Sequence, residues 1–290
     1  MPLVLLAQVG SSDSRVEIAW DFLGPCGVRI LSMEAESATR VPRVRDVNRP
    51  PAPKWQIGEV VDVIVETPET NTLRIQLAEP TPYTAGQYFN IRIPVEGRPR
   101  PIQRAYSVGS SPTDGLDTIE VGIRETEGGL VSPVLVRQTS VGSQLEVRGP
   151  YGEFTWTEAI PGPVLLIGAG SGVVPLKSII RYASHKGLSV PMHLLFSSKS
   201  AEFAIYLEEL AKLEAEEDWL TVDHTFTRDS DDTRAKYHRR IDKEMISEVY
   251  RISEPAIAFI CGPPEMVEEA ESTLVGLGMD PALVKTEKYD

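Results

Sequence analysis

The pattern of apolar and polar residues changes twice along the chain. Between residues 59 and 147, short runs rich in β-branched and aromatic residues are separated by turn residues at short intervals, which is typical of a small antiparallel barrel. We expect its six strands at residues 59–65, 72–77, 87–93, 105–109, 118–123 and 144–147. These runs predict an antiparallel six-stranded β-barrel over residues 55–157.

A continuous apolar run from Pro163 to Ile167 begins a second pattern, which indicates a parallel strand buried on both faces. Further strands are expected at residues 192–196, 220–226 and 256–260, with helices at 176–184, 206–216, 242–250 and 265–277. This alternation is typical of an α/β doubly wound parallel sheet. The sequence therefore predicts a second, α/β domain over residues 158–290.

Residues 1–54 resemble neither domain. A short apolar start is followed by a stretch rich in arginine and proline, which is typical of an extended linker. We expect a poorly ordered extension; the alternative is that translation begins at Met33. No Lys or Arg precedes Arg15, so we expect no secretory signal and a cytoplasmic protein. No segment has the roughly 18 consecutive apolar residues of a membrane-spanning helix, so we expect no membrane partner.

Composition narrows the possible functions. The formal net charge of −13 over 290 residues repels phosphate backbones, so nucleic acid is not an expected partner. Only two cysteines occur, Cys26 and Cys261, which excludes both a disulfide scaffold and a four-thiolate iron–sulfur cluster within the chain. If the protein passes on single electrons, the acceptor must be a separate molecule.

The run Arg104, Ala105, Tyr106, Ser107 concentrates chemistry in one predicted strand. A guanidinium can bind phosphate oxygens in a bidentate fork, and a phenol ring can lie flat on another aromatic system. The Ser107 hydroxyl, just past the ring, could reach a ring nitrogen. These residues suit a dinucleotide with a planar tricyclic head; the alternative is an ordinary edge strand with a surface arginine.

A second candidate site precedes a short predicted helix at residues 133–137. Gly129, Leu130, Val131 and Ser132 lead into that helix, and backbone amides at a helix N-terminus together with a serine hydroxyl form a natural pyrophosphate site. The alternative is a loop with a plain helix cap.

Glycines also lie between the first buried strand and the helix that follows it. Gly168, Gly170 and Gly172, with Pro175 after them, allow a pyrophosphate to sit over a helix N-terminus. Lys199 follows the next strand, where an acidic residue would hold a ribose hydroxyl. This favours a 2′-phosphate, and hence NADPH over NADH, unless Lys199 is a solvated surface charge.

Two further strand ends carry candidate nucleotide ligands. Arg228 and Arg239 follow the third strand of the α/β domain and could bind an adenosine phosphate, or belong to an ordinary charged loop. Cys261, Gly262 and Pro263 follow the fourth strand, where the reactive end of a nucleotide would lie. The alternative for Cys261 is an inert core residue.

Taken together and in this order, the motifs resemble the ferredoxin–NADP reductase superfamily, in the branch of single-chain bacterial reductases without a fused ferredoxin domain. The resemblance implies that Tyr106 stacks on the flavin and that Arg104 and the turn from Gly129 to Ser132 hold the FAD pyrophosphate. It also places Ser107 near flavin N5 and Cys261 beside the nicotinamide C4. The C-terminal Glu287 and Tyr289 match the family's spacing for residues near the flavin, although Asp290 follows them.

The resemblance predicts an FAD-dependent NAD(P)H oxidoreductase that passes electrons to a separate acceptor, which we expect to be a ferredoxin. The alternatives are a reductase component of an oxygenase or hydroxylase system and a non-catalytic flavin subunit of a larger complex. We expect a monomer with no metal site. Arg92, Arg98, Arg100 and Arg104 lie near the flavin segment, and the exposed ones would form a docking face for an acidic ferredoxin.

Overall fold

The computed structural model describes residues 20–22, 28–30 and 52–289, and the chain divides into two compact units, Met1–Pro51 and Ala52–Asp290. In the first unit, strand β1 (Trp20–Phe22) pairs antiparallel with β2 (Val28–Ile30). The rest of the predicted N-terminal extension up to Pro51, Met33 included, lies outside the described residues.

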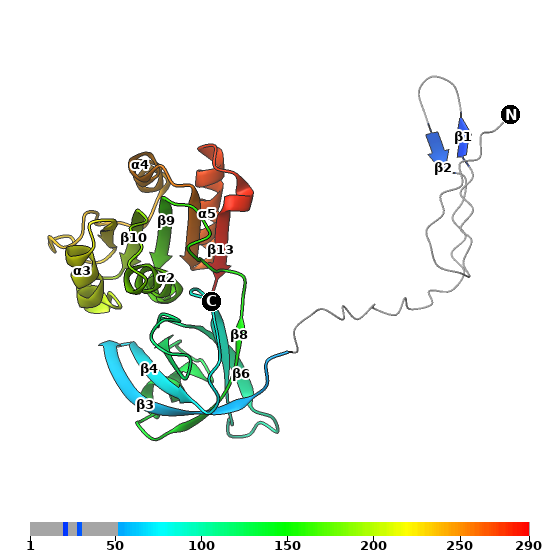
Figure 1. Cartoon of the computed structure of the whole chain (residues 1–290), viewed down its shortest axis with the longest axis vertical. Coiled ribbons are helices and arrows are strands. Elements are labelled where there is room, and N and C mark those ends of the chain that lie inside the picture. The colour runs from blue at the N-terminus through cyan, green and yellow to red at the C-terminus, as the bar shows by residue number, and fades with distance from the viewer. Residues whose placement is uncertain (1–19, 23–27, 31–51, 290) are drawn as a thin grey trace. The chain divides into compact units, whose positions relative to one another are not determined.

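The second unit begins with the predicted barrel (Figure 1). Its strands are β3 (Gln56–Thr67), β4 (Thr70–Leu77), β5 (Tyr88–Ile93), β6 (Ile102–Ser107), β7 (Thr118–Arg124) and β8 (Gln144–Tyr151). They form one antiparallel sheet in the order β6-β5-β8-β3-β4-β7. A bridge between Val108 and Val121 joins the two outer strands. The six-stranded antiparallel barrel is therefore confirmed.

The barrel core follows from side chains that alternate between its two sides. Along β5, Phe89 and Ile91 are fully buried, whereas Tyr88, Asn90 and Arg92 are half-buried. The short helix α1 (Ser132–Arg137) follows β7, and its Leu135 packs into the same core.

The α/β domain contains a five-stranded parallel sheet. Its strands are β9 (Val164–Ala169), β10 (Met192–Ser198), β11 (Leu220–Phe226), β12 (Ile257–Gly262) and β13 (Val284–Lys288), in the order β11-β10-β9-β12-β13. Its helices are α2 (Val173–His185), α3 (Leu207–Glu216), α4 (Lys243–Ser253) and α5 (Pro264–Gly276). Three short 3-10 turns are η2 (Gly170–Gly172), η3 (Ala201–Phe203) and η4 (Pro281–Leu283). Strand β13 is an element that the apolar pattern did not predict.

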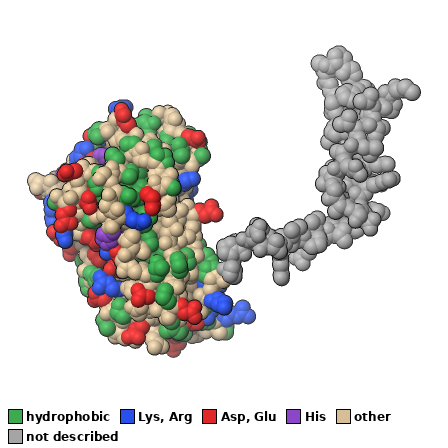
Figure 2. Space-filling model, viewed as in Figure 1, with side chains coloured by type: hydrophobic (Ala, Val, Ile, Leu, Met, Phe, Trp, Pro, Cys, Tyr) green, Lys and Arg blue, Asp and Glu red, His purple; other side chains and the backbone are tan. Residues whose placement is uncertain are grey.

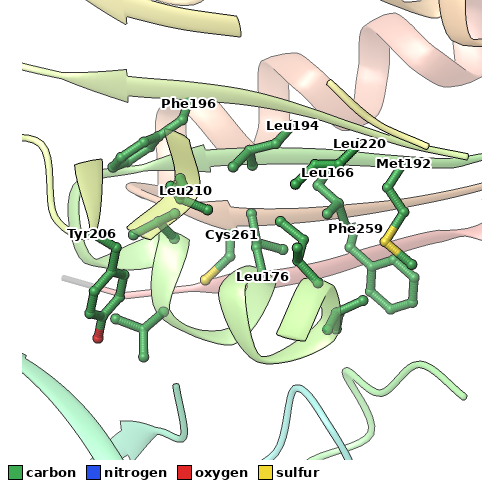
Figure 3. Packing of buried hydrophobic residues seen from close by; sticks show 14 of the residues in the cluster. Leu166, Leu176, Met192, Leu194, Phe196, Tyr206, Leu210, Leu220, Phe259 and Cys261 are labelled. Carbon is green, nitrogen blue, oxygen red and sulfur yellow. The ribbon is translucent and has the colours of Figure 1, made fainter. Parts of the chain in front are cut away.

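Both faces of the parallel sheet are covered, as the apolar run of β9 predicts. Leu166 packs into one cluster with α2 and α3, and its neighbour Leu165 packs into another with α4 and α5. Figure 3 shows the first cluster, with Cys261 beside Leu176 and Tyr206 at its margin. The doubly wound architecture is thus confirmed.

Helix α2 lies on the side of the sheet that faces the barrel (Figure 1). The Ser178 hydroxyl donates a hydrogen bond of 2.6 Å to the carbonyl of Ser110 in the barrel. The hydroxyls of Tyr206 and Thr72 lie 3.1 Å apart across the same boundary. Because polar and apolar contacts cross this boundary, the barrel and the sheet form one compact unit.

None of the helices in residues 52–289 is long and apolar enough to cross a membrane.

Candidate functional site

A cavity of about 950 Å³ lies where the barrel meets the carboxyl ends of the parallel strands. We call it the large cavity. It gathers predicted site residues that are far apart in the sequence, namely Arg104–Ser107, Gly129–Ser132, Cys261, Glu287 and Tyr289. In an open parallel sheet, ligands bind at this edge, so the position of the cavity agrees with a nucleotide site.

Strand β6 contributes a cation and an aromatic ring to this cavity. Arg104 is exposed, and its guanidinium donates 2.9 Å to the carbonyl of Gln103. Over residues 52–289, Arg104 makes no salt bridge, so its charge is available to an anion. Tyr106 packs partly against the barrel core, and burial raises its pKa to about 12. The phenol is therefore neutral at physiological pH, as a stacking ring should be.

The turn before α1 is shaped for close backbone approach. A Cβ on Gly129 would lie 2.9 Å from the Thr126 carbonyl oxygen and 3.1 Å from Ser132 Oγ. Ser132 Oγ accepts a 3.0 Å hydrogen bond from the Thr126 amide, which leaves its own proton to donate. The helix starts at Val131 without a side-chain cap. Amides and a hydroxyl here can therefore bind an anion such as a pyrophosphate.

Strand β13 brings a carboxyl group to Cys261. In the register of β12 and β13, Glu287 is the direct partner of Cys261. Burial raises the pKa of the Cys261 thiol well above its usual value, and the charge of Glu287 adds to this effect. The thiol is therefore protonated at neutral pH and is not a thiolate nucleophile.

Glu287 is a half-buried residue whose carboxyl group has few hydrogen-bond partners. Burial raises its pKa, and a hydrogen bond with the Ser107 side chain only partly opposes that effect. Its Oε2 atom is buried and has no hydrogen-bond partner among the described residues. A carboxyl group with a raised pKa and an oxygen that lacks a hydrogen-bond partner can take up and release a proton. Ser107, Cys261 and Glu287 therefore meet at one wall of the large cavity.

The glycine turn after β9 is packed against the end of β12. A Cβ on Gly172 would lie 2.1 Å from the carbonyl oxygen of Cys261, so only glycine fits there. Gly170 adopts a positive φ of 53°. The Tyr289 hydroxyl accepts a 3.2 Å hydrogen bond from the Gly172 amide and donates one to the carbonyl of Ala169. The Tyr289 hydroxyl is therefore already hydrogen-bonded to the Gly172 amide, which the glycine motif would otherwise present to a pyrophosphate.

Several predicted residues do not line the large cavity. Gly168 and Pro175 are buried beside the glycine turn, and Gly262 is buried at the end of β12, next to Pro263 at the start of α5. Arg239 is engaged by Asp242, with 2.5 Å between Nε and Oδ2.

Lys199 and Arg228 lie together at the ends of β10 and β11. The Arg228 amide donates 2.8 Å to the Lys199 carbonyl, and the Arg228 side chain is exposed. The Lys199 ammonium is not simply solvated, because it contacts both carboxylate oxygens of Glu69 at 2.6 and 2.7 Å.

Nine residues that the sequence motifs did not predict also line the large cavity. They are Tyr88, Gly122, Arg124, Glu125, Thr126, Glu127, Ser171, Val174 and Lys288. Tyr88 could have been found, since it pairs directly with Ser107 in the β5–β6 register. The residues after β7 carry no comparable signal, because only the folded loop directs them toward the cavity.

A second cavity of about 530 Å³, the small cavity, lies between the barrel and helices α2 and α3. Several of its charged side chains form one cluster around Glu120, whereas Glu66, whose pKa is raised by burial, makes no salt bridge within residues 52–289. Glu120 accepts from Arg74 at 2.8 Å, from Arg181 at 3.0 Å and from Lys177 at 3.5 Å. Lys177, with 1% of its surface exposed, also contacts Glu209 at 2.9 Å. Because the charge of Glu120 is matched by these cations, this cluster stabilises the contact between the barrel and helix α2.

Comparison with protein families agrees with this geometry. Residues 58–156 match the model of the oxidoreductase FAD-binding domain, and residues 166–272 match that of the oxidoreductase NAD-binding domain. The two matches cover the barrel and most of the α/β domain.

Curated relatives are similar over most of this chain. A protein from Sorangium cellulosum (strain So ce56) named ferredoxin–NADP reductase B is 32% identical over 215 residues, which are 72% of this chain and 86% of the relative. A Ralstonia protein is 29% identical over 80% of this chain and 68% of its own length. It is named as the ferredoxin–NAD(P)(+) reductase component of naphthalene 1,2-dioxygenase/salicylate 5-hydroxylase systems.

Solved structures share the fold. A ferredoxin NADP+ reductase from Neisseria gonorrhoeae with bound FAD and NADP matches with a TM-score of 0.70 at 23% identity, over 81% of this chain and 98% of that chain. An Amycolatopsis cytochrome P450 reductase matches with a TM-score of 0.71 at 24% identity, over 81% of this chain and 70% of that chain. At this identity the likeness concerns the fold alone.

Proposed function

Because the chain belongs to the ferredoxin–NADP reductase superfamily of FAD-dependent NAD(P)H oxidoreductases, we propose that its large cavity is where electrons pass from NAD(P)H to FAD. The observation that carries this proposal is the meeting of Ser107, Cys261 and Glu287 at one cavity wall. Three different elements supply these residues, so only the complete fold brings them together.

The residues around the large cavity fit FAD. The uncapped start of α1, the close approach allowed by Gly129 and the unpaired guanidinium of Arg104 suit a pyrophosphate. The neutral ring of Tyr106 suits stacking on a flat heterocycle. FAD, when bound, accepts a hydride from NAD(P)H and releases its electrons singly.

The protein's own residues would align the reactants and manage a proton. The Ser107 hydroxyl would donate a hydrogen bond to a nitrogen at the edge of the flavin, in place of its present partner Glu287. The small, protonated side chain of Cys261 would lie beside the nicotinamide, where it does not compete as a nucleophile. Glu287, whose pKa is raised by burial, would hold a proton close to both.

Replacing Ser107 with alanine tests this assignment. We expect flavin reduction by NAD(P)H, followed by stopped-flow absorbance, to slow by at least about tenfold, with FAD retention nearly unchanged. Ser140→Ala is the matched control, because Ser140 is exposed in a loop outside both cavities. Unchanged reduction in the Ser107 variant would show that its assigned role is wrong.

We also propose that the electrons leave for a separate protein, either a ferredoxin or an oxygenase component, as the names of the relatives suggest. Arg104 is exposed at the large cavity, and Arg98 and Arg100 are exposed in the hairpin that joins β5 to β6. Figure 2 shows Lys and Arg side chains at the right-hand edge of the barrel. Arg92 is not free for this role, because it is paired with Glu146 at 2.5 Å.

A salt titration tests the docking face. We expect turnover with an acidic ferredoxin to fall as ionic strength rises, since exposed charges act mainly on association rate. Turnover that is flat from low to high salt would eliminate docking through these arginines. We further propose that the monomer is active, because Ser107, Cys261 and Glu287 of one chain meet without a second copy; sedimentation combined with activity measurements can test this.

A simple assay separates an enzyme from a passive flavin subunit. The purified, FAD-loaded chain should be yellow, and NADPH or NADH alone should bleach it. A yellow protein that neither nucleotide bleaches would support the non-catalytic alternative.

A further inference from the structure

Glu69 is an acidic residue surrounded by cations. It lies in the turn between β3 and β4, in the barrel, yet its carboxylate contacts the Lys199 ammonium of the α/β domain at 2.6 and 2.7 Å. The Arg124 guanidinium approaches the same carboxylate at 3.6 Å. The hydrogen bond from Lys199 lowers the pKa of Glu69, and the charges of Arg124 and Arg228 act in the same direction. The carboxylate is therefore ionised at neutral pH.

The cations around Glu69 stand where a dinucleotide would place its adenosine. Lys199 follows β10, and Arg228 follows β11, with the Arg228 amide bonded to the Lys199 carbonyl at 2.8 Å. In a doubly wound sheet, the end of the second strand faces the adenosine ribose, and a basic residue there accommodates a 2′-phosphate. Arg124 lines the large cavity and continues the row of charges toward it.

A 2′-phosphate and the Glu69 carboxylate would compete for the same ammonium. Both are anions that bind Lys199 through oxygen atoms, and Glu69 already holds it through both of its oxygens. A phosphate brought to Lys199 would either displace Glu69 or sit beside a like charge, and each costs binding free energy. NADH, which has a hydroxyl at this position, meets neither cost.

We propose that Glu69 is a specificity-determining residue, whose carboxylate occupies Lys199 and so disfavours NADPH relative to NADH. This inference rests on the proposed function, namely that NAD(P)H binds at the carboxyl ends of the parallel strands. The sequence alone predicts that Lys199 favours a 2′-phosphate. A lysine after the second strand does not favour that group when a carboxylate from the other domain is already paired with the lysine.

The role does not depend on Glu69 holding the fold together. The side chains of Lys199 and Glu69 are 28% and 38% exposed, and a pair this accessible contributes little to stability. The turn is held by the Glu69 backbone, whose carbonyl accepts from the Glu125 amide at 2.7 Å. A Glu69→Gln variant keeps this backbone bond, removes the negative charge and leaves one oxygen that can accept from Lys199.

The test is calorimetric titration of two probes into the FAD-loaded protein. The probes are 2′,5′-ADP, which carries the 2′-phosphate, and 5′-AMP, which lacks it. We expect Glu69→Gln to bind 2′,5′-ADP about tenfold more tightly than the wild type, with 5′-AMP affinity changed less than about twofold. The ratio of kcat/KM for NADPH over NADH should rise by a similar factor.

Two further variants show whether the effect acts through Lys199. In a Lys199→Gln background, adding Glu69→Gln should raise the affinity for 2′,5′-ADP by less than about threefold. The reason is that the ammonium for which the carboxylate and the phosphate compete is absent. The control is Glu216→Gln, whose exposed carboxylate contacts only Lys212, at 3.8 Å on α3. It should change neither affinity.

The failure of this inference can be distinguished from the failure of the proposed function. An unchanged 2′,5′-ADP affinity in Glu69→Gln, or an equal gain for both probes, overturns the role of Glu69, while bleaching of the flavin by either nucleotide leaves the proposed function standing. A wild-type protein that binds neither probe and is bleached by neither nucleotide overturns both.

Discussion

Two glutamates, the buried Glu120 and the half-buried Glu287, lie at the boundary between the barrel and the sheet, in opposite electrostatic conditions. Burial alone would raise the pKa of Glu120, but Lys177, Arg74 and Arg181 together lower it below its usual value. Partial burial raises the pKa of Glu287, and only a hydrogen bond with Ser107 opposes that rise. The same residue type is thus held ionised at position 120 and pushed toward its neutral form at position 287.

The difference separates a carboxylate that stabilises the fold from a carboxyl group that can take part in a reaction. A carboxylate matched by three cations ties the barrel to α2 but has no capacity left for a ligand. A carboxyl group left with an unpartnered oxygen contributes nothing comparable to stability, yet it can exchange a proton at a site where reactants meet. The predictions for Glu120 and Glu287 test this contrast directly, and those for Gly122 and Tyr289 test the packing and the chemistry beside it.

The largest effect is expected for Glu120→Gln. It leaves Lys177, which is 1% exposed, with a single acidic partner, and loss of a buried charge partner costs about 3 kcal/mol. Urea unfolding of the variant should show this loss in the free energy of unfolding. Glu287→Gln, the matched change at the large cavity, should leave stability unchanged or higher. Equal destabilisation by both variants would contradict the contrast.

The two variants should also respond oppositely to pH. The pKa of Glu120 is lower in the folded protein than its ordinary value of 4.5, so its stabilisation is complete above that pH and is lost as the pH falls through the folded pKa. The pKa of Glu287 is raised above 4.5, so its destabilisation is absent below that pH and grows as the pH rises toward the folded pKa. The wild type should therefore be more stable than Glu120→Gln and less stable than Glu287→Gln at pH 7.

These stability differences should both approach zero in acid. Denaturant unfolding measured across a pH series follows them directly. A difference for Glu120→Gln that grows as the pH falls would show that Glu120 is not the matched group described here.

An intermediate effect is expected for Gly122→Ala at the tight domain contact. The added Cβ would lie 2.6 Å from Val174 Cγ2 and 2.7 Å from the Tyr206 hydroxyl, and overpacking of this kind costs about 1–3 kcal/mol. Gly276→Ala is the control, because a Cβ at the end of α5 meets nothing within 4 Å. Thermal unfolding should show a lower Tm for the first variant only.

The smallest effect is expected for Tyr289→Phe at the large cavity. Loss of the hydroxyl frees the Gly172 amide for a pyrophosphate, so NAD+ affinity should rise roughly threefold, the equivalent of one modest hydrogen bond. Tyr250→Phe, on α4 and away from both cavities, should not alter binding. Weaker NAD+ binding by Tyr289→Phe would mean that the hydroxyl helps to bind the nucleotide.

Much of this architecture could be predicted because strong local patterns specify it. The apolar run of β9 predicted a strand buried on both faces, and Leu165 and Leu166 indeed pack into separate cores. Strand β13 was missed because Val284 is its only large apolar residue and it lies at the edge of the sheet. Such a strand has no periodic signal of its own and forms by pairing with β12.

The site was harder to predict, because it depends on contacts between distant segments. Motif spacing led to Cys261 and Ser107, but the register that sets Glu287 opposite Cys261 exists only once β13 has formed. The partner of Lys199 is Glu69, 130 residues earlier and in the other domain. The charge of Lys199 is evident from the sequence, but its pairing with Glu69 depends on the folded structure.

The segment that leaves the barrel has a practical meaning for protein engineering. Phe154 and Trp156 precede the predicted domain boundary, yet both pack into the core of the parallel-sheet domain, where Phe154 meets Phe259 with ring centroids 5.2 Å apart. A hybrid reductase joined at residue 157 would leave that core without two of its native rings. Domain exchange should therefore place the junction before Phe154, so that the sheet keeps the aromatic residues it was built around.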